Sequence, residues 1–165
     1  LAAEGHTGKS TLAAAFAQAG YRVLSEDVSC LRTDSAPAVV PGPSLLRLRP
    51  DVTPHLTIPG SRLLRRSPSR VTLALDPERR GSCDPVPLRA VLLLEASANG
   101  FARERIAAAE GIRRLWPLAF HVPIDRWRAR CFTQLAHVAS EVPIFTFARP
   151  LRLKELRATV EYLVS

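Results

Sequence analysis

The sequence has no methionine, only two lysines and only three cysteines among its 165 residues. No apolar run is long enough to span a bilayer, so we predict no membrane partner. Cys30, Cys83 and Cys131 are odd in number, far apart and not at metal-ligand spacing. These absences argue against a disulfide framework and a zinc site, and we expect a cytoplasmic protein.

Arginine supplies almost all of the net charge of +8. Such a charge fits a surface for nucleic acid or for an acidic partner. The arginines are scattered along the chain, however, and the local cluster of Arg62, Arg65, Arg66 and Arg70 has no aromatic residues between its charges to stack on bases. We therefore predict no nucleic-acid partner.

A glycine-bracketed segment near the start of the chain, called here the Gly-Lys-Ser loop, consists of Gly5, His6, Thr7, Gly8, Lys9, Ser10 and Thr11. An alanine-rich run follows it and ends at Gly20. A glycine-rich turn that leads into a helix presents backbone N–H groups to phosphates. Lys9 would reach the β- and γ-phosphates of a nucleotide, and the Ser10 hydroxyl would bind Mg²⁺.

Two observations qualify this phosphate-loop interpretation. The usual spacing asks for glycine at position 3, where this chain has Ala3. The simpler alternative is a chance Gly-Lys-Ser at an ordinary helix start. Because the chain begins at Leu1 and has no methionine, we also expect it to be truncated at its N-terminus, without most of the strand that would precede the loop.

Apolar periodicity predicts helices over residues 10–19, 102–115, 124–141 and 153–164, with Trp127 among the buried residues. Strands are predicted over residues 21–25, 45–49, 71–75, 88–95 and 142–147, and a loop over residues 57–70. The length favours a single domain over residues 1–165. The order of elements predicts an α/β fold with a mixed sheet and flanking helices.

An acidic pair, Glu26 and Asp27, ends the predicted strand that returns beside the loop. Transfer of a γ-phosphoryl group to a hydroxyl needs a metal ligand and a carboxylate that takes the proton. The pair could supply both, and a solvated acidic turn is the alternative.

Together these stretches resemble the HPr kinase/phosphorylase-type serine kinases. The resemblance is closer to short members of that group, such as those that phosphorylate lasso peptide precursors. It lies in residues 5–13, 20–27 and 41–48, and extends to residues 143–145, Arg149-Pro150 and the closing helix.

The resemblance implies a fold like the nucleotide domain of ATP-dependent phosphoenolpyruvate carboxykinase. It implies that the Gly-Lys-Ser loop binds ATP, with Lys9 and Ser10 holding the triphosphate and Mg²⁺. Asp27 matches the family aspartate that helps to hold the metal. Glu26 stands where the family has its general base, an aspartate, so the carboxylate is one methylene longer here.

We therefore expect an ATP- and Mg²⁺-dependent kinase that phosphorylates a serine-type hydroxyl on a small protein, peptide or metabolite. One alternative is a catalytically altered ATP-binding regulator or scaffold. Another is a general phosphate-loop ATPase, whose acidic residue would be Glu95 after the apolar strand. We do not predict phosphorylase activity. The role of Arg47, the acceptor and the oligomeric state stay open, with a homo-oligomer as one alternative.

Overall fold

The computed structural model describes residues 1–3, 5, 7–76, 84–120 and 122–165, and has mixed α/β structure. The chain forms two compact units, each assembled from segments that are separate in the sequence. The first unit contains Leu1–Thr7, Arg32–Ala38 and Pro87–Pro150, and the second contains Gly8–Leu31, Val39–Val86 and Leu151–Ser165. The single domain expected from the sequence stays a prediction.

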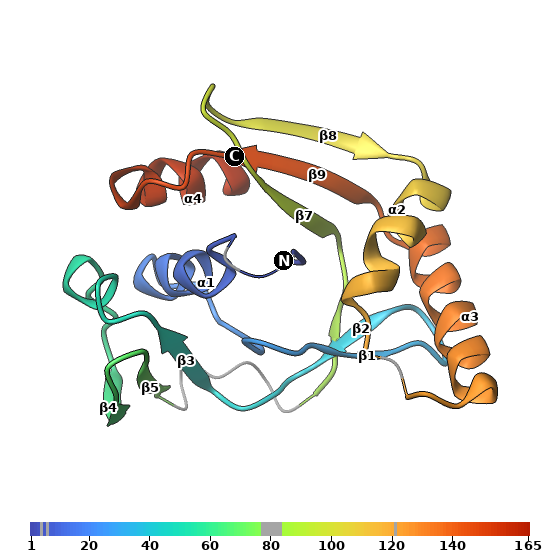
Figure 1. Cartoon of the computed structure of the whole chain (residues 1–165), viewed down its shortest axis with the longest axis horizontal. Coiled ribbons are helices and arrows are strands. Elements are labelled where there is room, and N and C mark those ends of the chain that lie inside the picture. The colour runs from blue at the N-terminus through green and yellow to red at the C-terminus, as the bar shows by residue number, and fades with distance from the viewer. Residues whose placement is uncertain (4, 6, 77–83, 121) are drawn as a thin grey trace. The chain divides into compact units, whose positions relative to one another are not determined.

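A three-stranded sheet in the order β7-β9-β8 organises the first unit (Figure 1). Strand β9 (Ile144–Arg149) lies in the middle, parallel to β7 (Val91–Ala96) and antiparallel to β8 (Ala102–Ile106). Helix α2 (Ala108–Leu115) packs against α3 (Asp125–Glu141). The core of this unit gathers the buried side chains of Leu93, Leu115, Ala139 and Ile144.

The first residues of the chain extend this sheet beside β7. Ala2 forms a parallel bridge with Leu93. Its N–H donates to the Leu92 carbonyl at 2.8 Å, and its carbonyl accepts from the Leu94 N–H at 2.9 Å. Ala2 therefore runs parallel to β7 at the edge of this sheet.

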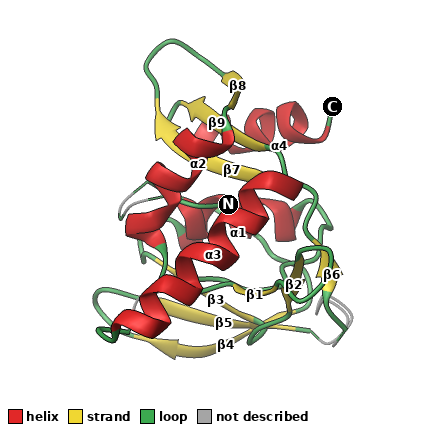
Figure 2. Ribbon diagram, turned by 90° about the vertical axis from the view of Figure 1, so that its right-hand side faces the viewer, coloured by secondary structure: helices red, strands yellow, loops and turns green. Residues whose placement is uncertain are grey.

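The second unit is built on an antiparallel sheet in the order β3-β5-β4 (Figure 2). Its strands are β3 (Leu45–Leu48), β5 (Val71–Leu75) and β4 (Ser61–Arg66). Helix α1 (Lys9–Gln18) contacts both β3 and α4 (Leu156–Val164). The buried core contains Ala14, Ala17, Val23, Leu46, Leu48, Ile58 and Leu75. The small alanine side chains let the helix approach the sheet closely.

Three further short strands form a separate small sheet. They are β1 (Cys30–Arg32), β2 (Ala38–Val40) and β6 (Val86–Pro87), which pair in the order β1-β2-β6. The 3₁₀ turns are η1 (Thr53–His55), η3 (Trp116–Leu118) and η4 (Leu153–Glu155). Within the described ranges, no helix has the length and apolarity needed to cross a membrane.

Most of the predicted elements are confirmed. The predicted helices at residues 10–19 and 124–141 correspond to α1 and α3, and the last predicted helix becomes η4 followed by α4. Four predicted strands correspond to β3, β5, β7 and β9. The bounds of β5 are those predicted, and the bounds of the other three differ by a few residues. Strand β7 has fully buried residues at its centre, as its continuous apolar run predicted.

Two segments that were predicted as other structures are strands. Residues 57–70, predicted as a loop, contain β4, whose side chains are almost all exposed. Because β4 is an edge strand, it needs no alternation of apolar and polar residues. Residues 102–106, predicted as the start of a helix, form β8. Backbone pairing with β9 holds these residues in an extended strand, and the helix begins only at Ala108.

Two smaller expectations are also wrong. Residues 21–25 form no strand, although Val23 makes an isolated bridge and is buried. Trp127 is 43% exposed rather than buried. Its ring lies against the guanidinium groups of Arg126 and Arg130. Arg126 directly precedes Trp127 on α3, and Arg130 lies one helical turn later.

Truncation of Leu46 tests the core of the second unit. Leu46 has no exposed surface and lies against α1, so Leu46→Ala should lower the free energy of unfolding by about 2–5 kcal/mol. Leu63→Ala removes the same atoms from a side chain that is 51% exposed. This control should change the free energy of unfolding by less than about 0.5 kcal/mol. Urea denaturation measures both changes, and equal losses would contradict this packing.

Candidate functional site

The start of helix α1 forms the first part of the site. Gly8 precedes the helix with φ 76°, a left-handed conformation that disfavours a side chain, and its carbonyl accepts a hydrogen bond from the Leu12 N–H at 2.9 Å. Lys9 and Ser10 form the first turn and are half-buried. The N-terminal end of the helix favours negative charge, because its backbone N–H groups point out along the axis.

A hydrogen bond connects this first turn to the acidic pair. The Ser10 hydroxyl donates to Glu26 Oε1, although the two residues are 16 positions apart. Helix α1 and the short segment after it bring Glu26 back to the helix start. The contact joins the Gly-Lys-Ser loop to the acidic pair.

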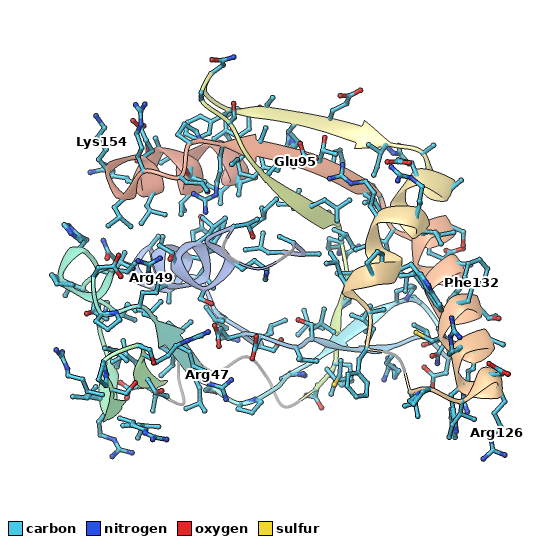
Figure 3. The ribbon with its side chains drawn as sticks, in the orientation of Figure 1. Arg47, Arg49, Glu95, Arg126, Phe132 and Lys154 are labelled. Atoms are coloured by element: carbon cyan, nitrogen blue, oxygen red, sulfur yellow. The ribbon has the colours of Figure 1, made fainter. Side chains whose placement is uncertain are left out.

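Asp27 has a different partner from its neighbour. Its backbone has φ 38°, unusual for a residue other than glycine, so the chain turns between the two carboxylates. Arg47 Nη1 donates to Asp27 Oδ2 at 3.1 Å. Arg47 lies on β3 between the buried Leu46 and Leu48, and is labelled in Figure 3. Glu26 and Asp27 are therefore held by different elements.

Gly42 explains how the acidic segment reaches this position. Its N–H donates to the Leu24 carbonyl at 2.8 Å. A Cβ atom at Gly42 would lie only 3.0 Å from Ser25 Cβ, so this close approach favours glycine. The Pro41-Gly42-Pro43 segment thus packs directly before Glu26, and the following strand β3 returns Arg47 to Asp27.

Arg149 anchors the first half of the loop within the first unit. It ends strand β9, is only 2% exposed, and donates from Nη2 to the Thr7 carbonyl at 3.2 Å. Its Nη1 donates to the Pro150 carbonyl, also at 3.2 Å. Burial lowers the pKa of the Arg149 guanidinium below its usual range. A buried cation next to Thr7 places positive charge at the loop backbone.

The structure brings some of the predicted site residues together. Gly8, Lys9, Ser10, Thr11, Glu26 and Asp27 all belong to the second unit, and Ser10 and Glu26 are in contact. Gly5 and Thr7 belong to the first unit. His6 lies outside the described residues.

The oxygen atoms of the site are compatible with magnesium. Among the described residues, no group of three or more His, Cys, Asp or Glu side chains could hold a metal. Mg²⁺ on a nucleotide needs fewer protein ligands, because one or two carboxylates share it with phosphates and water. The contacting oxygens of Ser10 and Glu26 offer ligands of the type that Mg²⁺ prefers.

Sequence reasoning did not assign the partners of two arginines. Arg47 was noted in its motif, but its contact with Asp27 depends on the register of β3, which the sequence does not give. Arg149 lies in a segment that carries the family resemblance, but the sequence assigned it no contact and no function. An arginine at the end of an otherwise mostly apolar strand was the signal that could have identified it.

Comparison with known proteins finds no family model, no curated protein and no solved structure that matches this chain. The resemblance to HPr kinase-type enzymes therefore stays a prediction.

Substitution of Arg149 tests the anchoring of the loop. Arg149→Lys should lower the free energy of unfolding by about 1–3 kcal/mol, because a buried ammonium cannot reproduce both guanidinium hydrogen bonds. Arg152 is exposed and lies nearby in the sequence. Arg152→Lys should therefore change the free energy of unfolding by less than about 0.5 kcal/mol. Thermal denaturation followed by circular dichroism compares the two, and an unaffected Arg149→Lys protein would refute the anchoring role.

Proposed function

We propose that this protein is an ATP-dependent kinase that transfers the γ-phosphoryl group to a serine-type hydroxyl of a small protein, peptide or metabolite. The contact of the Ser10 hydroxyl with Glu26 carries the proposal. It joins the Gly-Lys-Ser loop, whose composition suits a triphosphate, to the acidic pair that phosphoryl transfer requires. An ordinary helix start would not need a carboxylate at this position.

Several features of the loop favour binding of a nucleoside triphosphate. The left-handed Gly8, the helix N-terminus and Lys9 combine backbone donors and a cation at one place. As part of the same proposal, the fold is like the nucleotide domain of phosphoenolpyruvate carboxykinase. We also propose a cytoplasmic setting, which the free thiols of Cys30 and Cys131 support.

The proposed reaction forms one bond and breaks one. The acceptor oxygen attacks the γ-phosphorus, and the bond from that phosphorus to the β,γ-bridging oxygen breaks to release ADP. The hydroxyl proton passes to a carboxylate of the acidic pair and then to water. Bound Mg²⁺ would neutralise charge on the phosphates. Lys9 would bind the phosphate oxygens, and the Ser10 hydroxyl would supply an oxygen ligand.

The ATPase alternative gains no support from Glu95. Its carboxylate accepts a hydrogen bond from Arg114 Nη2 at 2.5 Å, and the pair lies between β7 and α2 of the first unit. The partner of this carboxylate is therefore a side chain of helix α2 and not a residue of the Gly-Lys-Ser loop. The regulatory or scaffold alternative predicts nucleotide binding without turnover, which the following experiment distinguishes.

Removal of Lys9 tests the kinase proposal. The protein is incubated with γ-labelled ATP, Mg²⁺ and a serine-centred peptide library supplemented with free serine and glycerol. The expected result is label in a hydroxyl acceptor, and Lys9→Ala should reduce its rate by about 100- to 1000-fold through loss of charge stabilisation.

Lys154 provides the matched control, because it is the only other lysine and lies exposed in η4 (Figure 3). Lys154→Ala should retain the rate of the unmodified protein. Label found only in inorganic phosphate would favour an ATPase instead. ATP binding without any turnover would favour a regulator, and equal rates in the two variants would refute the assignment of Lys9.

A further inference from the structure

We propose that the two adjacent carboxylates divide their work in the reverse of the order that the family resemblance implies. Glu26 belongs to the metal end of the site, and Asp27 is the base that faces the acceptor hydroxyl. Arg47 is the positioning residue that orients Asp27. This inference rests on the proposed kinase function and concerns the same site.

The contact of Glu26 assigns it to the metal end. In phosphate-loop enzymes the serine or threonine after the lysine binds Mg²⁺ through its hydroxyl. The carboxylate that accepts a hydrogen bond from Ser10 therefore lies where the metal and the β- and γ-phosphates would be. The attacking and leaving oxygens lie roughly in line on opposite sides of the γ-phosphorus. A carboxylate bound to Ser10 is thus poorly placed to receive the acceptor proton.

The backbone turn directs Asp27 away from that end. Its φ of 38° lies in a region that costs free energy for a residue with a side chain, and such conformations gather at functional sites. Asp27 is exposed whereas Glu26 is half-buried, so a large acceptor can reach Asp27 more easily. Proton transfer to Asp27 would leave a neutral carboxylic acid, which then releases the proton to water.

Arg47 holds Asp27 through one carboxylate oxygen. The contact engages Oδ2, so Oδ1 can accept the hydrogen bond from an acceptor hydroxyl without displacing the arginine. Side chains of both residues are largely exposed, at 46% and 71%, and exposed ion pairs contribute little to folding stability. Substitution of Arg47 can therefore change activity while leaving the fold intact.

A similar arginine on the same segment provides an internal control. Arg49 lies two residues beyond Arg47 and binds Asp51 at 3.0 Å, also through exposed side chains. Figure 3 labels both arginines. Asp27 directly follows Glu26, the carboxylate that contacts Ser10, whereas Asp51 does not. The pair of Arg49 and Asp51 is therefore the same kind of ion pair at a different place in the chain.

The roles of the carboxylates are tested by calorimetric titration of the full chain with ATP, in Mg²⁺ and in EDTA. Glu26→Gln keeps an acceptor for the Ser10 hydroxyl but loses the charge. It should weaken the Mg²⁺-dependent part of ATP affinity by about 10- to 100-fold. Asp27→Asn should change the Mg²⁺-dependent part of the ATP affinity by no more than about twofold. The same substitution should abolish phosphoryl transfer to the acceptor mixture described above.

The opposite pattern, in which Asp27→Asn loses the Mg²⁺ dependence and Glu26→Gln keeps it, overturns the assignment while leaving the kinase proposal intact. Equal effects of the two substitutions also overturn it. An unmodified protein that binds no ATP in either condition refutes the kinase proposal itself. The two failures are therefore distinguishable.

The role of Arg47 is tested by label transfer to the same mixture. Arg47→Ala should lower kcat by about 10- to 100-fold, the effect of misplacing a reacting group by about 1 Å, with little change in KM for ATP. Arg47→Lys should recover part of the loss, and Arg49→Ala should behave like the unmodified protein. Equal rates for Arg47→Ala and Arg49→Ala would show that Arg47 forms only a surface ion pair.

Discussion

Close packing of α1 against β3 is the constraint on which the second unit and its site depend. Ala14, Ala15 and Ala17 of α1 have almost no exposed surface and allow the helix to lie directly on the leucines of β3. The same helix begins with Lys9 and Ser10, and the same strand places Arg47 outward between two buried leucines. Both edges of the site are therefore fixed by one apolar contact.

The segment between these two elements holds the acidic pair. Its entry is set by the end of α1, and its exit passes Gly42, which permits close contact with the backbone at Leu24 and Ser25. A turn at Asp27 then separates two adjacent carboxylates, so that one contacts a helix start and the other contacts a strand. This separation gives two groups of similar chemistry different surroundings, which is how carboxylates in one site acquire different tasks.

Local sequence patterns predicted the elements that have strong internal signals. Helix α1 has a glycine on each side and a run of good helix formers, and β7 has a continuous apolar run of strand length. Strands β4 and β8 carry mostly exposed side chains, so their sequences contain little periodicity. Their structure comes from hydrogen bonds to a neighbouring strand, and the sequence of a single strand does not show that partner.

The sequence by itself determined the chemistry available to this protein: a glycine-bracketed lysine and serine before a helix, and two carboxylates in the following segment. These are local properties, set by residue types and short spacings. Only the tertiary structure decided that Ser10 meets Glu26, that Asp27 meets Arg47 and that Arg149 reaches Thr7. Those contacts join residues 16, 20 and 142 positions apart, and they depend on packing and strand register, which no local pattern specifies.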